Sequence, residues 1–143
     1  MRIAYVSGVW DLFHIGHLRM LQRSRTLCDF LVVGVAEDKY VEEYKEYLPI
    51  ISLAERMEIV VAFRCVDAVM SYWGPGDLRP MERYGATTRI VGPEFGRYPA
   101  QQVARTEMRK LGIKLMVLPR TPGVSTSAIK EKCHAETEEL AGR

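Results

Sequence analysis

Short apolar runs alternate along the chain with stretches in which apolar residues recur every three or four positions. The runs are bounded by turn residues and predict five strands, at Arg2–Ser7, Phe30–Ala36, Val66–Ser71, Thr88–Val91 and Lys114–Leu118. The periodic stretches predict five helices, at about His17–Cys28, Leu53–Phe63, Leu78–Tyr84, Ala100–Leu111 and Thr126–Leu140. Strands that alternate with helices pair in parallel through right-handed crossovers. The pattern therefore predicts a single-domain α/β fold over residues 1–143, with a Rossmann-like doubly wound five-stranded parallel sheet.

Two predicted helices carry clear end signals. Ser52 and Glu55 have the spacing of a capping box at the start of the second helix. Gly112 stands where a C-terminal cap would end the fourth. In a doubly wound fold, ligands bind beyond the carboxyl ends of the strands, so functional residues are expected in the segments that follow strands.

Composition narrows the function classes. A net charge of +2 with mixed signs indicates neither a nucleic-acid surface nor a membrane surface, so the expected partners are small molecules, without nucleic acid and without membrane insertion. No apolar run approaches the ~18 residues of a membrane span, and the N-terminus has no signal-like region. Cys28, Cys65 and Cys133 have no metal-site spacing and are expected to be reduced and structural, which favours a cytoplasmic protein.

The segment Gly8–Leu18 joins the first strand to the first helix. It holds two of the three histidines, His14 and His17, with Gly16 between them. Side chains three apart lie on the same side of a helix start, where free N–H groups and the helix dipole attract phosphate. An isolated histidine is more often structural, but this combination predicts a triphosphate site that presents both imidazoles.

Three separated segments resemble the nucleotidyltransferase superfamily with the HxGH signature, and within it the small cytidylyltransferases that act on glycerol 3-phosphate or phosphoethanolamine. They are Gly8–Leu18, Ile51–Asp67 and Arg120–Thr126. The third reads Arg-Thr-Pro-Gly-Val-Ser-Thr and resembles the cytidylyltransferase branch, which favours CTP over ATP. The resemblance implies an enzyme that moves CMP from CTP to a small phosphorylated or phosphonate-bearing alcohol, releases pyrophosphate and uses Mg²⁺.

The resemblance also implies roles for individual residues. The expected catalytic groups are His14, His17, Lys45 and Arg120, of which the histidines donate to the triphosphate. The expected nucleotide-binding set is Gly8, Val9, Trp10, Asp11, His14, His17, Gly92, Glu94, Arg120, Thr121, Ser125 and Thr126. Lys39 competes with Lys45 for the phosphate contact, and the alternative for Lys45 is a solvated lysine in a charged loop. The metal ligands are not specified.

Arg64 and Asp67 resemble a family element near the subunit interface and the substrate pocket, so both are expected to bind substrate together with Lys45. The alternative is a structural ion pair. The helix before them is apolar over much of its circumference from Ile59 to Phe63, which predicts a homodimer. Packing of both faces within one subunit is the alternative.

Three positions depart from the family pattern or allow two roles. Trp10 stands where the family has Phe or Tyr. Gly92-Pro93-Glu94 replaces an Asp-rich loop that helps to frame the base; Pro93 lacks a backbone donor, and Glu94 is the expected substitute for the acidic residue. Asp11 holds its loop through backbone amides or lies near the metal.

Other functions are compatible with the pattern. An adenylyltransferase of the same fold would use ATP on FMN, phosphopantetheine or a sugar phosphate. A class I aminoacyl-tRNA synthetase fragment shares His-Ile-Gly-His, but this chain lacks a Lys-Met-Ser-Lys-Ser loop. A non-catalytic nucleotide sensor would not need both histidines. The identity of the acceptor is not encoded in a recognisable way, although Arg97 and Tyr98 are candidates to reach its phosphate.

Overall fold

The computed structural model describes residues 1–142, and it confirms an α/β fold around a five-stranded parallel sheet. The strands are β1 (Ile3–Gly8), β2 (Phe30–Ala36), β3 (Ala68–Tyr72), β4 (Thr88–Val91) and β5 (Lys114–Val117). The helices are α1 (Ile15–Thr26), α2 (Asp38–Lys45), α3 (Leu53–Val61), α4 (Arg79–Tyr84), α5 (Pro99–Lys110) and α6 (Thr126–Ala141). No helix of this part of the chain is long and apolar enough to cross a membrane.

The strand order is β3-β2-β1-β4-β5, and every neighbouring pair is parallel. The chain builds outward from β1 through β2 to β3, then returns to place β4 on the other side of β1. The strand order thus reverses between β1 and β4. In open α/β sheets this switch point opens a crevice at the carboxyl ends of the strands.

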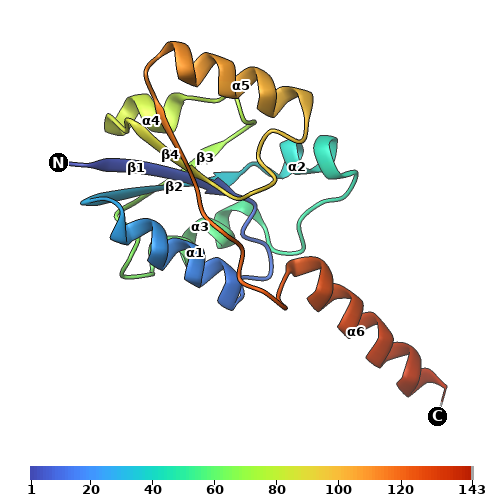
Figure 1. The fold of residues 1–143 in the computed structure, drawn as a ribbon. Helices are drawn as coiled ribbons and strands as arrows, with labels where there is room; N and C mark the ends of the chain where they lie inside the picture. The colour runs from blue at the N-terminus through green and yellow to red at the C-terminus, as the bar shows by residue number, and fades with distance from the viewer. Residues whose placement is uncertain (143) are drawn as a thin grey trace.

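Helices cover both faces of the sheet (Figure 1). On one face, Val6 and Ile90 of the sheet pack with Leu21 of α1 and Val60 of α3. On the other face, Tyr5 packs with Met81 of α4. Each such apolar side chain contributes about 1.5–3 kcal/mol when it is fully buried. Helix α6 extends away from the sheet and buries none of its side chains (Figure 1).

Helix α2 is the element that the apolar pattern did not predict. The segment that carries Lys39 and Lys45, for which no helix was predicted, is an eight-residue helix. Its apolar positions are Tyr40, Val41 and Tyr44, of which Val41 is fully buried, and so short a pattern does not stand out among charged residues. The ends of all the other elements lie within two residues of the predicted ones.

Candidate active site

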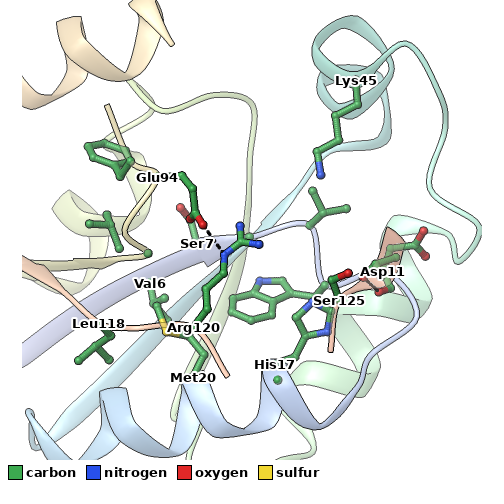
Figure 2. A pocket seen from close by; sticks show the side chains of 18 of the residues that line it. Val6, Ser7, Asp11, His17, Met20, Lys45, Glu94, Leu118, Arg120 and Ser125 are labelled. Atoms are coloured by element: carbon green, nitrogen blue, oxygen red, sulfur yellow. Dashed lines mark hydrogen bonds and ion pairs between the residues drawn. The ribbon is translucent and has the colours of Figure 1, made fainter. Parts of the chain in front are cut away.

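A cavity of about 510 Å³ opens at the carboxyl ends of β1, β4 and β5, at the switch point of the sheet (Figure 2). Every residue of the predicted nucleotide-binding set lines it, together with Lys45: Gly8, Val9, Trp10, Asp11, His14, His17, Gly92, Glu94, Arg120, Thr121, Ser125 and Thr126. The loops after three strands therefore bring these sequence-predicted residues together at one place.

The two histidines form a stacked pair at the start of α1. The His14 ring caps the helix, because its Nδ1 accepts the N–H of Gly16 at 3.0 Å. The Nδ1 of His17 accepts the N–H of His14 at 3.3 Å. The two ring centroids are 3.8 Å apart. Since each Nδ1 accepts a hydrogen bond, a neutral ring carries its proton on Nε2. Both rings thus offer an Nε2–H donor.

Burial keeps both imidazoles neutral. It lowers the pKa of His14 below the ordinary histidine value. For His17, burial is the main cause and the adjacent His14 adds to it, which lowers the pKa to about 3. Near neutral pH the pair is therefore a set of neutral hydrogen-bond donors and not a pair of fixed positive charges.

Gly16 allows the beginnings of α1 and α6 to meet. A Cβ at this position would lie 2.9 Å from Cε1 of His14 and 3.0 Å from Cγ1 of Val124. Non-bonded carbon atoms do not pack this closely in a protein. Any side chain at Gly16 would therefore push either the His14 ring or the segment before α6 out of place.

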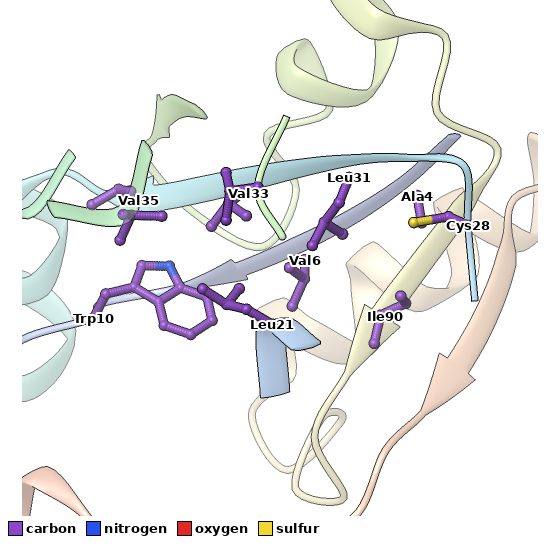
Figure 3. Close-up of a cluster of buried hydrophobic side chains, with 11 residues drawn as sticks. Ala4, Val6, Trp10, Leu21, Cys28, Leu31, Val33, Val35 and Ile90 are labelled. Carbon is purple, nitrogen blue, oxygen red and sulfur yellow. The ribbon is translucent and has the colours of Figure 1, made fainter. Parts of the chain in front are cut away.

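Trp10 supports the histidine pair from the hydrophobic core. Its indole N–H donates to the carbonyl of Gly34 at 2.8 Å, and its ring meets that of His17 edge-on at a centroid distance of 5.3 Å. The side chain joins the buried cluster that includes Leu21 and Val35 (Figure 3). Trp10 has a left-handed φ of 59°, which a bulky residue rarely adopts. The core thus holds a strained loop beneath His17.

Asp11 has the loop-fixing geometry, one of its two expected roles. Its carboxylate accepts the N–H groups of Leu12, Ile50 and Ile51 at 3.1, 2.9 and 3.0 Å. Only 4% of the residue is exposed. The ammonium of Lys130 lies 3.8 Å from the same carboxylate. With these donors in place, Asp11 joins the loop after β1 to the segment before α3.

Arg56 is a structural residue of the site to which the sequence analysis assigned no role. It is fully buried and donates to the carbonyls of Val9, Ala36 and Ile51 at 2.6, 2.9 and 2.9 Å. It also pairs with the carboxylate of Asp38. The residue thereby ties together the loops that follow β1 and β2. Its only signal was its position inside the second segment of the family resemblance.

Across the cavity, α6 begins beside the loop after β1. The hydroxyl of Ser125 accepts the N–H of Ala128 at 3.0 Å, and the hydroxyl of Thr126 donates to the carbonyl of Asp11 at 2.9 Å. Arg120 reaches toward Glu94 (Figure 2), with its Nε 2.7 Å from Oε1 of Glu94. Two helix N-termini thus border one cavity, and such termini favour anions.

Positive charge gathers at the same place. Lys45 extends from α2 into the cavity (Figure 2). Its pKa is lowered, chiefly because the surrounding chain displaces water and next because of the positive charges of Lys130 and Arg120. Positive charges placed this close together indicate a local potential suited to a highly charged anion.

The structure does not bring Arg64 and Asp67 to the cavity. The Asp67 carboxylate accepts the N–H of Leu31 at 2.7 Å and pairs with Arg25 at 3.2 Å, near the amino ends of β2 and β3. Neither Arg64 nor Asp67 is among the residues that line the cavity, and nor is Lys39. The ion pair of Asp67 is with Arg25, which lies far away in the sequence.

The histidine pair makes stability depend on pH. Below about pH 6.5 the histidine of the unfolded chain binds a proton, whereas His17 of the folded chain stays neutral down to its pKa of about 3. As the pH is lowered through this range, the free energy of unfolding should therefore decrease by up to about 1.4 kcal/mol per pH unit. His17→Asn, whose amide oxygen can replace Nδ1 as acceptor, should flatten this fall. Urea unfolding between about pH 7.5 and about pH 5 measures it. Parallel pH profiles for the two proteins would contradict the expectation.

Comparisons with known proteins agree with the fold described above and identify the family. The chain is 33% identical over 132 residues to the bifunctional protein HldE of Geotalea uraniireducens, covering 92% of this chain and 26% of that protein. For HldE of Koribacter versatilis the identity is 33% over 135 residues, covering 93% and 27%. The chain thus spans about a quarter of the length of these relatives.

Solved structures share the architecture. The lipopolysaccharide core biosynthesis protein of Thermoplasma volcanium matches with a TM-score of 0.67 and 24% identity, over 85% of this chain and 97% of that one. TmcAL of Thermotoga maritima, solved with α-thio ATP, matches with a TM-score of 0.66 and 16% identity, over 98% and 52%. The family model described as cytidylyltransferase-like matches residues 5–132, which is most of the chain. The chain therefore belongs to the cytidylyltransferase-like family of nucleotidyltransferases.

Proposed function

We propose that this chain transfers a nucleoside monophosphate from a nucleoside triphosphate to a small phosphorylated or phosphonate-bearing alcohol, with release of pyrophosphate. One observation carries the proposal. The neutral, stacked imidazoles of His14 and His17 and the guanidinium of Arg120 line one cavity, between the N-termini of two helices. This arrangement suits the binding of a triphosphate and the stabilisation of charge on its phosphates.

The chemistry needs little from the protein beyond position and charge. An oxygen of the acceptor phosphate attacks the α-phosphorus, and the bond from that phosphorus to the bridging oxygen of pyrophosphate breaks. The acceptor oxygen is already ionised near neutral pH, so the chain does not have to supply a general base. The Nε2–H groups of His14 and His17 donate to oxygens that gain charge, and Lys45 and Arg120 balance the leaving pyrophosphate.

Mg²⁺ fits this site as an ion that accompanies the triphosphate. The residues from 1 to 142 contain no group of three carboxylate, His or Cys side chains that would hold a metal by themselves. Mg²⁺ commonly keeps several waters and binds through substrate phosphates with one or two carboxylates. Asp11 is held by backbone N–H groups, which leaves Glu94, here paired with Arg120, as the carboxylate that would contribute. When bound, the ion would supply neutralisation of phosphate charge.

The donor base has two candidates. CTP follows from the Arg120–Thr126 segment and its resemblance to cytidylyltransferases. ATP is the second candidate, because TmcAL was solved with α-thio ATP and a pantoate-β-alanine ligase of the same fold from Francisella tularensis with a β,γ-ATP analogue. Pro93 stands in the loop that frames the base in cytidylyltransferases and has no backbone N–H, so this chain lacks one donor that a cytosine could use there.

A pyrophosphate-release assay tests the proposal. CTP and ATP are each offered with glycerol 3-phosphate, phosphoethanolamine, phosphocholine, a hydroxyalkylphosphonate and a panel of sugar phosphates. Turnover that requires both a nucleotide and one acceptor supports nucleotidyl transfer and identifies the donor. Absence of turnover with every pair, in a folded protein that binds nucleotide, would favour a non-catalytic sensor.

Arg120→Ala is expected to weaken binding of the triphosphate by roughly tenfold or more, because a charge-assisted contact is worth about 1.5–3 kcal/mol. Ser125→Ala and Thr126→Ala should have milder effects, since the backbone donors of α6 remain. Calorimetric titration with CTP and with ATP measures the change. An unchanged affinity in Arg120→Ala would mean that this side of the cavity does not hold phosphate.

We also propose a homodimer built on α3. Arg56 and Val60 of this helix are buried, whereas Ile59 and Val61 are 37% and 51% exposed. An apolar surface on the outer side of a helix favours a second copy as its cover. Light scattering at micromolar concentration should give about twice the 16.3 kDa of one chain. A mass near that of one chain would contradict the dimer.

A further inference from the structure

Part of the cavity lies on the other face of the sheet from the histidine pair. Side chains alternate along β4, so that Ile90 packs toward α1 and α3 while Arg89 lies on the opposite face. There its Nη1 contacts the sulfur of Met108 of α5 at 3.8 Å. Arg89, Ser7 and Tyr72 all line the cavity. None of these three residues belongs to a motif that the sequence pattern marks as functional.

Arg89 is a buried cation without an acidic partner. It is 2% exposed, and among residues 1–142 no carboxylate forms an ion pair with it. Its Nη1 donates to the carbonyl of Pro75 at 2.8 Å and its Nη2 to the hydroxyl of Ser7 at 3.1 Å. Its Nε is buried and has no hydrogen-bond partner within the described chain.

The acid that interacts with Arg89 from a distance is already paired. The Asp77 carboxylate binds Arg79 at 2.6 Å and accepts the N–H of Trp73 at 3.1 Å. The guanidinium carbon of Arg89 lies 5.4 Å from the ring centroid of Tyr5 and 5.2 Å from that of Phe95. Aromatic faces of this kind offset only part of the cost of a buried charge.

Burying a charge without an ionic partner costs free energy of desolvation. Burial lowers the pKa of Arg89, which expresses the same cost. A Leu or Met side chain would fill a similar volume without an unpaired donor. A buried cation that borders a cavity, with its Nε unpartnered within the described chain and only neutral partners on Nη1 and Nη2, therefore indicates that an anion completes its surroundings.

The neighbouring walls of the cavity are aromatic. Tyr40 and Tyr44 stack with ring centroids 5.7 Å apart, and Tyr98 meets Tyr44 edge-on at 5.1 Å. Tyr40, Tyr44, Tyr72, Phe95 and Tyr98 all line the cavity. Ring faces beside phenol hydroxyls suit the organic part of a small molecule better than they suit a triphosphate.

We propose that Arg89 is the anion-binding residue of an acceptor subsite, which holds a phosphate monoester on the tyrosine-lined side while the triphosphate lies against His14, His17 and Arg120. The assignment rests on the proposed function. It makes Arg89 a determinant of acceptor specificity, since a neutral alcohol would leave the buried charge unbalanced. The alternative is a purely structural tether between Pro75 and Ser7.

Arg89→Gln separates these roles, because glutamine keeps hydrogen bonding to neutral partners and removes the charge. In the pyrophosphate-release assay this variant should raise the KM for the acceptor roughly tenfold or more and leave the KM for the nucleotide within about twofold. Arg83→Met, which removes a positive charge from α4 away from the cavity, should match the wild type. Equal changes in both KM values, or none, would overturn the assignment.

Binding of inorganic phosphate provides a readout without turnover. By calorimetry, His17→Ala should retain a phosphate site that Arg89→Gln and Arg89→Met lose. Arg89→Met should also unfold at a temperature no lower than the wild type, whereas loss of a structural tether would lower it. A lower unfolding temperature with unchanged phosphate affinity in Arg89→Gln, or no phosphate binding by His17→Ala, would overturn the proposal. Failure of nucleotidyl transfer itself would instead appear as absent turnover in the wild type.

Discussion

His17→Ala and His14→Ala are each expected to lower kcat by about 100- to 1,000-fold, with a much smaller change in the KM for the nucleotide. The capping hydrogen bonds to Nδ1 of both rings fix Nε2–H as the donor. Donors held in this way bind best when charge develops on the phosphates, so their loss affects the transition state more than the ground state. Steady-state pyrophosphate release measures both constants.

His134→Ala is the matched control. This third histidine is exposed on α6, where it lies 3.2 Å from Glu138, and it does not line the cavity. It should leave kcat unchanged. Because the His14 ring also caps α1, circular dichroism must show that each variant is folded. Near wild-type turnover in either folded variant of the pair would remove the histidines from the mechanism.

The general fold was predictable because the apolar pattern reports which residues face the core. Strands β2 and β4 were predicted to the residue, since the apolar run of β2 lies between Asp29 and Glu37 and β4 ends at Gly92. The cavity-lining set was predictable for a different reason. In a parallel sheet all carboxyl ends lie at one edge, so motifs that follow different strands must meet. Residues as far apart as Asp11 and Thr126 thus form a direct hydrogen bond.

Buried charges account for much of what the sequence did not reveal. An arginine in a sequence pattern resembles a surface residue, yet Arg56 and Arg89 are 0% and 2% exposed. Their partners are mostly backbone carbonyls from other loops, which leave no trace in side-chain identity. The tyrosines of α2 were missed with the helix that carries them. Asp67 was assigned by family position, although its hydrogen bonds join the opposite end of the sheet.

Arg56→Met is expected to lower the free energy of unfolding by about 3–5 kcal/mol, because three backbone carbonyls lose a buried donor and each unsatisfied group costs about 1–3 kcal/mol. The carboxylate of Asp38 would lose its arginine, and the carbonyls of Val9, Ala36 and Ile51 would lose a donor. An unsatisfied buried polar group carries its full desolvation cost. The loops after β1 and β2 would loosen together, so activity should fall as well.

Urea unfolding followed by circular dichroism measures the loss in Arg56→Met. Arg2→Met is the control, because it also removes an arginine that pairs with an aspartate, Asp29, but both partners are exposed. Exposed ion pairs contribute little, so Arg2→Met should unfold almost as the wild type does. Similar midpoints for Arg56→Met and Arg2→Met would show that the loops keep their positions without Arg56. The alignment of the histidine pair would then depend on the other contacts of the loop after β1, among them the bonds of Trp10 to Gly34 and of Asp11 to Ile50 and Ile51.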